Sequence, residues 1–222
     1  MAKKLLEICC YNVESVEVAA KAGAHRVEFC SPVFTGGGTP KENDLTEAKK
    51  KGIRTFVMLH PREGNYAYDD AAFEKLKQQV KRFKELGAEG LVMGVLDENG
   101  NIDIDRNKEL IALASPLEIT LHKAFDEVKD PFKALEDAIS CGFTRILTSG
   151  TKKTALEGKS ILAELVARAN GRIIIMAGGS IRSTNIRELA GTGVIEYHSS
   201  SLPAGESIAS EKEIREMLRE LA

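Results

Sequence analysis

The residues that could carry out chemistry lie at the ends of short apolar runs. Two Glu-x-Cys pairs, Glu7 with Cys9 and Glu28 with Cys30, each close such a run. Thiolates bind soft metal ions, whereas carboxylates bind harder ions or transfer protons. The pairs therefore favour either a metal site or acid–base chemistry. The alternative for each thiol is a structural role in the core, because free cysteines are common core residues.

Histidines close two further runs. His122 precedes Asp126 by four residues. The two could form an oriented general base, a metal ligand held by a carboxylate, or a hydrogen bond that only fixes a loop. His198 could equally be a functional imidazole or a core histidine with its hydrogen bonds satisfied. The residues that we expect to act as acids or bases are Glu7, Glu28, His122 and Asp126.

These clusters need elements that bring them together, and the chain alternates short β-rich runs with amphipathic segments. The predicted strands are Lys4–Cys9, Arg26–Ser31, Arg54–His60, Gly90–Leu96, Leu117–Lys123, Thr144–Ser149, Arg172–Ala177 and Val194–Ser199. The predicted helices are Glu14–Ala22, Ala71–Leu86, Asp105–Ala114, Pro131–Cys141, Ala155–Ala169, Thr184–Ala190 and Glu211–Leu221.

Eight such units nearly fill the 222 residues, which predicts one domain over residues 1–222, a parallel (β/α)₈ barrel. An open doubly wound sheet is the alternative, but no GxGxxG follows the first strand. Glycines such as Gly23 and Gly142 fall where helices end, and Ser183 and Ser210 are candidate N-caps.

In a barrel the polar clusters meet at the C-terminal ends of the strands. Alternation along the strands puts Glu7 with Cys9, and Glu28 with Cys30, on one face each. If these faces point inward, the buried carboxylates need partners, and Arg62 and Lys123 are the candidates.

Two glycine-rich loops could contact a ligand. The loop after the seventh strand occupies the corner where many barrels bind phosphate, so we expect Gly178, Gly179 and Ser199, with Arg62, to bind an anion. The loop Thr35–Pro40 is flexible enough to cover or admit a ligand, although it lacks the Gly-Lys-Ser/Thr end of a Walker motif.

Composition limits the partners. With 43% apolar residues and a net charge of −2, the chain is typical of a soluble globule, and neither nucleic acid nor an anionic membrane is expected as a partner. No run approaches the length of a membrane span. Four cysteines without a CxxC pair indicate reduced thiols, and hence a cytoplasmic protein.

Ordered motifs over nearly the whole chain resemble the CutC family. They include Arg26-Val27-Glu28-Phe29-Cys30-Ser31, His122-Lys123-Ala124-Phe125-Asp126, Leu147-Thr148-Ser149-Gly150, Ile173-Ile174-Ile175-Met176-Ala177-Gly178-Gly179 and Glu196-Tyr197-His198-Ser199-Ser200. The resemblance implies a TIM-like barrel, copper handling, a cytoplasmic location and a homo-oligomer. The sequence departs from the family pattern where His60 and Glu63 replace an arginine and a glycine.

Two functions remain open. In the first, which the resemblance implies, the protein binds copper as Cu(I) for copper homeostasis. Cys9 and Cys30 would be ligands because thiolates suit Cu(I), with His198 or His122 as a third. In the second, a barrel enzyme acts on a small phosphorylated or carboxylated metabolite. A third, less specific hypothesis is a scaffold that binds a protein partner.

Overall fold

The computed structural model describes residues 3–32 and 37–222, in which eight parallel strands close into a barrel. Each strand pairs with the next, and β8 returns to β1 with Leu5 opposite Glu196. This closure confirms the barrel and excludes the open sheet. The strands are β1 (Leu5–Cys10), β2 (Arg26–Phe29), β3 (Thr55–Met58), β4 (Gly90–Met93), β5 (Glu118–Leu121), β6 (Arg145–Thr148), β7 (Ile174–Gly178) and β8 (Glu196–Ser199).

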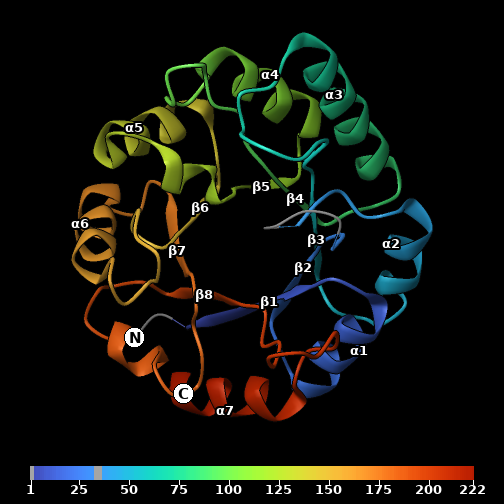
Figure 1. The fold of residues 1–222 in the computed structure, drawn as a ribbon, viewed down its shortest axis with the longest axis vertical. Coiled ribbons are helices and arrows are strands. Elements are labelled where there is room, and N and C mark those ends of the chain that lie inside the picture. The colour runs from blue at the N-terminus through green and yellow to red at the C-terminus, as the bar shows by residue number, and fades with distance from the viewer. Residues whose placement is uncertain (1–2, 33–36) are drawn as a thin grey trace.

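Helices surround the strands in a ring, which Figure 1 shows in a view along the barrel. The helix α7 follows the last strand and packs beside α1, which completes the ring of helices. The α-helices of the described residues are α1 (Val13–Ala22), α2 (Glu42–Lys49), α3 (Asp70–Glu85), α4 (Ile104–Ala114), α5 (Pro131–Cys141), α6 (Lys159–Ala169) and α7 (Glu211–Leu221).

Local signals explain most helix boundaries. Asp130 caps α5 with Pro131 in its first turn, and Ser210 caps α7. Gly23 and Gly142 end their helices in the left-handed conformation that glycine adopts without steric cost. The predictions for α5 and α7 agree with the structure residue for residue.

Other boundaries differ. The predicted helix from Ala155 begins only at Lys159, because the turn before it passes so close to the end of β6 that a Cβ on Gly158 would lie 1.9 Å from the carbonyl oxygen of Ser149. The predicted helix Thr184–Ala190 is a short 3₁₀ turn, η2 (Ile186–Leu189). Ser183 does not cap it and instead donates to Glu213 in α7.

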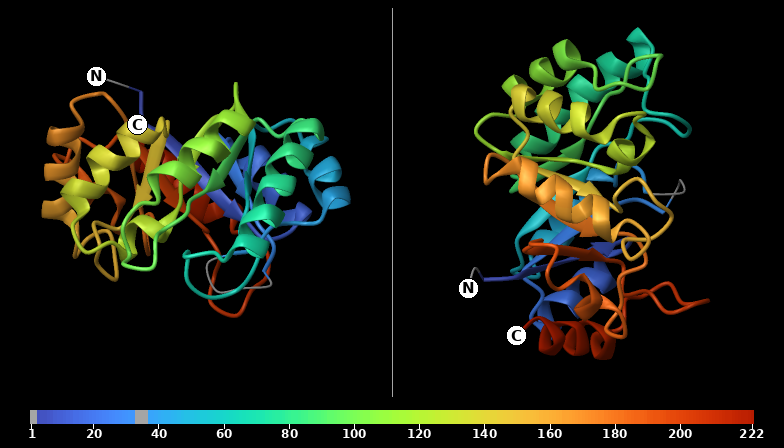
Figure 2. Two further views of the ribbon diagram at one scale, coloured as in Figure 1. Left: turned by 90° about the horizontal axis from the view of Figure 1, so that it is seen from above. Right: turned by 90° about the vertical axis from the view of Figure 1, so that its left-hand side faces the viewer.

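The apolar core lies mainly between the barrel and the helices, where Leu6, Ile8 and Cys10 of β1 point. The barrel interior holds a smaller apolar cluster, formed by Cys9, Cys30, Phe56, Met58 and Val92. Figure 2 shows the loops after β3 and β8 projecting from one end of the barrel, which is the end where the strands finish. That end carries the polar clusters, and we refer to it as the mouth.

Candidate functional site

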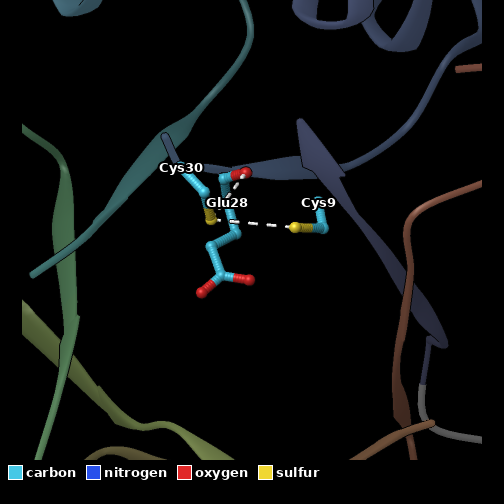
Figure 3. Close-up of side chains that lie close together, drawn as sticks. All are labelled: Cys9, Glu28 and Cys30. Atoms are coloured by element: carbon cyan, nitrogen blue, oxygen red, sulfur yellow. Dashed lines mark hydrogen bonds between the residues drawn. The ribbon is translucent and has the colours of Figure 1, made fainter. Parts of the chain in front are cut away.

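Neighbouring strands β1 and β2 place two thiols inside the mouth. Cys9 and Cys30 are both buried, and their sulfur atoms lie 3.7 Å apart in a weak hydrogen bond. An oxygen of Glu28 lies within 4.8 Å of both sulfurs. Figure 3 shows Cys9 and Cys30 facing each other, with the Glu28 carboxylate beside them. The alternation predicted from the sequence is therefore confirmed for both strands.

His198 of β8 joins the thiol pair to both carboxylates. Its Nδ1 lies 2.8 Å from Oε1 of Glu7, and its Nε2 lies 3.4 Å from Oε2 of Glu28. Glu7, Glu28 and His198 thus form a second group whose ligand atoms lie within 4.8 Å of one another. The two groups share Glu28, so the candidate site is one continuous cluster of two thiols, two carboxyl groups and an imidazole.

The partner of the buried Glu7 carboxylate is Arg26, which lies opposite it in β2. Arg26 also pairs with Glu196 at 2.7 Å, and Arg145 joins Glu196 at 3.0 Å. The proposed partners, Arg62 and Lys123, were wrong. The sequence did contain the relevant signal, because residues 26, 28 and 30 share one face of β2 and that face points into the barrel.

Opposing influences give the two carboxyl groups different protonation states. Burial alone would raise the pKa of Glu7, but the charges and hydrogen bonds of Arg26 and His198 lower it to about 2. Burial, followed by the negative charge on Cys9, raises the pKa of Glu28 well above its usual range. Glu7 is therefore ionised at neutral pH, whereas the shift at Glu28 favours its protonated form.

The pKa values of the two thiols are also shifted in opposite directions. The hydrogen bond from Cys30, together with the contacts of His198, lowers the pKa of Cys9 to about 5 against the effect of burial. Burial and the neighbouring Cys9 raise the pKa of Cys30. Burial would lower the pKa of His198, but its hydrogen bond to Cys9 and the charges of Glu28 and Glu7 raise it. These opposite shifts favour a thiolate at Cys9 beside an imidazolium at His198.

His122 belongs to an aromatic group on the other side of the mouth. Its ring is buried and lies 4.4 Å from that of Tyr66 and 6.1 Å from that of His60, centroid to centroid. Nδ1 accepts the backbone N–H of Ala124, so the proton of the neutral ring is on Nε2. Burial lowers the pKa of His122 to about 3, which makes it a neutral donor rather than a general base at neutral pH.

Asp126 fixes a loop, which is one of the three roles left open by the sequence. Its carboxylate accepts hydrogen bonds from the hydroxyl of Thr148 and from the backbone and hydroxyl of Ser149. It also accepts the backbone N–H of Thr151, and Lys123 lies 3.4 Å away. With its oxygens directed at the end of β6, Asp126 does not orient His122.

The residues predicted to bind an anion are engaged elsewhere. The guanidinium of Arg62 donates to the carbonyl groups of Glu63 and Ala67 in its own loop. The hydroxyl of Ser199 donates to the carbonyl oxygen of Ile181 and accepts from Arg182. Gly178 ends β7, and the loop after it, which begins with Gly179, leads into the short η2 rather than an α-helix. Anion binding there stays a prediction.

The glycine-rich loop after β2 lies only partly within the described residues, since Thr35 and Gly36 fall outside them. Gly37 has φ +90° and packs so closely on Cys30 that a Cβ would lie 3.0 Å from the Cβ of that cysteine. The carbonyl of Gly37 also lies 3.2 Å from Nδ1 of His60. The described part of the loop therefore packs against one of the two thiols.

Several residues of the barrel interior and its mouth were not identified from the sequence as site residues. Arg26 and Arg145 escaped notice because charged side chains inside a barrel are uncommon. Tyr66 lies in a long loop whose path no periodicity reveals.

None of the helices in the described residues is long and apolar enough to cross a membrane.

Fold and site together define a class: a parallel eight-stranded barrel with a buried thiol, carboxyl and imidazole cluster at its mouth. The model of the CutC family matches residues 4–202, and the chain belongs to this family. It is 42% identical to the copper homeostasis protein cutC homolog of Mus musculus, over 91% of this chain and 75% of that protein. The human homolog is 43% identical over 89% of this chain and 73% of its own length.

Solved structures agree with this assignment. The CutC protein of Streptococcus agalactiae is 33% identical, has a TM-score of 0.83, and is matched over 89% of this chain and 98% of its own. Thiamine phosphate pyrophosphorylase from Pyrococcus furiosus, at 19% identity and a TM-score of 0.64 over 98% of this chain and 95% of its own, shares the barrel fold alone.

The buried arginine should be the most sensitive site for stability. Arg26→Met leaves two buried carboxylates without their shared cation, and we expect it to lower the free energy of unfolding by about 3–5 kcal/mol. The measurement is urea unfolding followed by circular dichroism. Arg172→Met, which removes a surface pair with Glu136, is the control and should cost about 1 kcal/mol or less. Equal losses in the two variants would contradict this assignment.

His122 should make the fold sensitive to acid. Its pKa is about 3 when folded and about 6.5 when unfolded, so only the unfolded chain takes up a proton between these values. Its contribution to stability is present above pH 6.5 and is lost as the pH falls toward 3.

Asn at position 122 keeps an acceptor for the N–H of Ala124 but does not titrate. Between about pH 7.5 and about pH 5, His122→Asn should therefore lose about 2 kcal/mol less stability than the wild type. Denaturant unfolding at a series of pH values measures the difference. Identical pH dependence in the two proteins would rule out a buried neutral histidine.

Proposed function

We propose that the protein acts in copper homeostasis by binding Cu(I) between the thiols of Cys9 and Cys30. The observation that carries the proposal is the distance of 3.7 Å between two buried sulfurs. Metal–thiolate bonds of about 2.3 Å let one ion contact both sulfurs in a bent arrangement. Thiolates are the ligands that select Cu(I), and the relatives of this chain carry the name copper homeostasis protein.

The surroundings of the thiols support a soft ion. Cys9 is ready to bind because its low pKa gives a thiolate at neutral pH. The raised pKa of Glu28 favours its protonated form, which is a poorer metal ligand than a carboxylate. His198 interacts with Cys9 and could supply a third ligand once metal binding displaces a proton from its ring. Glu7 is paired with Arg26, which keeps its carboxylate out of the ligand set.

The proposal extends to location and assembly. Cu(I) binding needs reduced thiols, and all four cysteines are free, which supports a cytoplasmic protein. The family resemblance supports a homo-oligomer, whose size light scattering would measure.

Titration of the reduced protein with Cu(I) against a competing chelator tests the site. One equivalent should bind, and Cys9→Ser or Cys30→Ser should weaken binding by on the order of 100-fold or more, since each removes a ligand. Cys141→Ser changes a thiol at the end of α5 and should leave the affinity unchanged. Equal affinities in all four proteins would exclude this pair as the copper site.

A second candidate is a barrel enzyme acting on a small carboxylated or phosphorylated metabolite. It is favoured by two buried polar atoms, Oε1 of Glu28 and Nε2 of His122, that have no hydrogen-bond partner within the described residues. A ligand with one donor and one acceptor could satisfy both. The neutral His122 could donate to a carbonyl or oxyanion, as neutral imidazoles do in other barrels.

Thermal unfolding with a panel of small phosphate esters and carboxylic acids tests this candidate. A ligand of the site should raise the unfolding temperature of the wild type, and His122→Phe should abolish the shift because it removes the donor. Glu63→Gln, in an exposed loop, is the matched control and should respond like the wild type. If no compound raises the unfolding temperature of the wild type, the result contradicts the hypothesis of a barrel enzyme.

A further inference from the structure

We infer that Cys9 and Cys30 form a reversible redox couple that a hydroperoxide oxidises to a disulfide and a small dithiol reduces again. This inference requires only the two thiols and goes beyond copper binding. The two thiols face each other in the mouth, and they come from neighbouring segments of the barrel wall, as Figure 3 shows.

The distance between the sulfurs favours a bond. At 3.7 Å they are already in contact, and a disulfide of about 2.05 Å requires them to approach by about 1.7 Å. Cys30 follows Phe29, the last residue of β2, and its N–H donates to the carbonyl oxygen of Cys10 in β1. This hydrogen bond holds the two backbones together, so rotation of the two side chains has to supply most of the approach.

Exposure decides the order of events. Cys9 is 6% exposed and Cys30 only 1%, so a small peroxide entering the mouth meets Cys9 first. Cys30 is shielded by the inner apolar cluster and by Gly37. Cys9 is accordingly the attacked thiol, and Cys30 is the resolving thiol behind it.

The chemistry balances in two steps. The sulfur of Cys9 attacks one oxygen of the hydroperoxide, the O–O bond breaks, and the other oxygen takes up the proton shared by the Cys9–His198 pair and leaves as an alcohol or water. The resulting sulfenic acid reacts with the Cys30 thiol, forming the S–S bond and releasing water. The two thiols lose two electrons in total, which reduce the peroxide. A dithiol restores both thiols by exchange.

Oxidation and reduction of the two thiols would switch Cu(I) binding off and on. A metal ligand must be a thiolate, and a disulfide sulfur is not one. Oxidation therefore removes both proposed ligands of Cu(I) at once, whereas reduction restores them. The cysteines Cys10 and Cys141 take no part, because Cys10 lies in the core outside the barrel and Cys141 ends α5.

The test treats reduced, metal-free protein with one equivalent of hydrogen peroxide and maps its tryptic peptides without reduction. Lys21 and Arg26 lie between the two cysteines, so trypsin separates them unless a disulfide joins their peptides. We expect the joined peptides in the wild type, in Cys141→Ala and in Cys10→Ala. The last variant removes the other thiol on the Cys9 peptide. Dithiothreitol should separate them.

Variants of the pair identify the order of the steps. Cys30→Ser should accumulate a sulfenic acid at Cys9, which dimedone traps, whereas Cys9→Ser should form neither product. Circular dichroism checks that both variants are folded, and the wild-type peptide map decides the matter if either is not. Peroxide-treated wild type in which both thiols remain free to alkylation, or in which Cys9 is overoxidised while Cys30 stays a thiol, would overturn the inference.

Cu(I) titration of the same samples separates the two proposals. A protein that forms the disulfide but does not bind Cu(I) when reduced contradicts copper binding alone. A protein that binds Cu(I) but forms no disulfide contradicts the redox couple alone. Both proposals predict strong binding by the reduced protein and its loss after peroxide treatment, with recovery after dithiothreitol.

Discussion

The arrangement of the mouth depends on one buried cation, the guanidinium of Arg26. Inside a barrel that is otherwise closed to water, an ionised carboxylate is stable only beside an opposite charge. Arg26 supplies this charge to Glu7 and Glu196 together. Its charge lowers the pKa of Glu7, and the ionised Glu7 in turn acts on the groups nearer the mouth.

The effect passes from Arg26 to the thiols through His198. The ionised Glu7 holds Nδ1 of His198 at 2.8 Å and favours the imidazolium. The imidazolium and the Cys30 thiol stabilise the Cys9 thiolate. Glu28 lies 3.4 Å from Nε2 of His198, but burial and the charge on Cys9 outweigh this contact and raise its pKa. The two glutamates thus differ because strand register puts Glu7 opposite Arg26 and Glu28 opposite Cys9.

The sequence was informative where its patterns are local. The spacing of strands and helices predicted the barrel, and Asp130, Pro131 and Ser210 placed the starts of α5 and α7. The alternation of β1 and β2 placed Glu7, Cys9, Glu28 and Cys30 inside. Sequence patterns failed to predict the structure where separate backbone segments approach closely. The start of α6 is displaced because Gly158 packs on Ser149, and no periodicity reports such a contact.

By itself the sequence determined the fold, the family and the set of groups at the strand ends, because hydrophobic periodicity and helix caps are properties of neighbouring residues. Only the tertiary structure decided which groups meet. It paired Glu7 with Arg26 rather than Arg62, directed Asp126 to β6, and brought Cys9 within 3.7 Å of Cys30. Contacts inside a barrel depend on strand register and on the direction of each side chain, and both are settled only when the sheet closes.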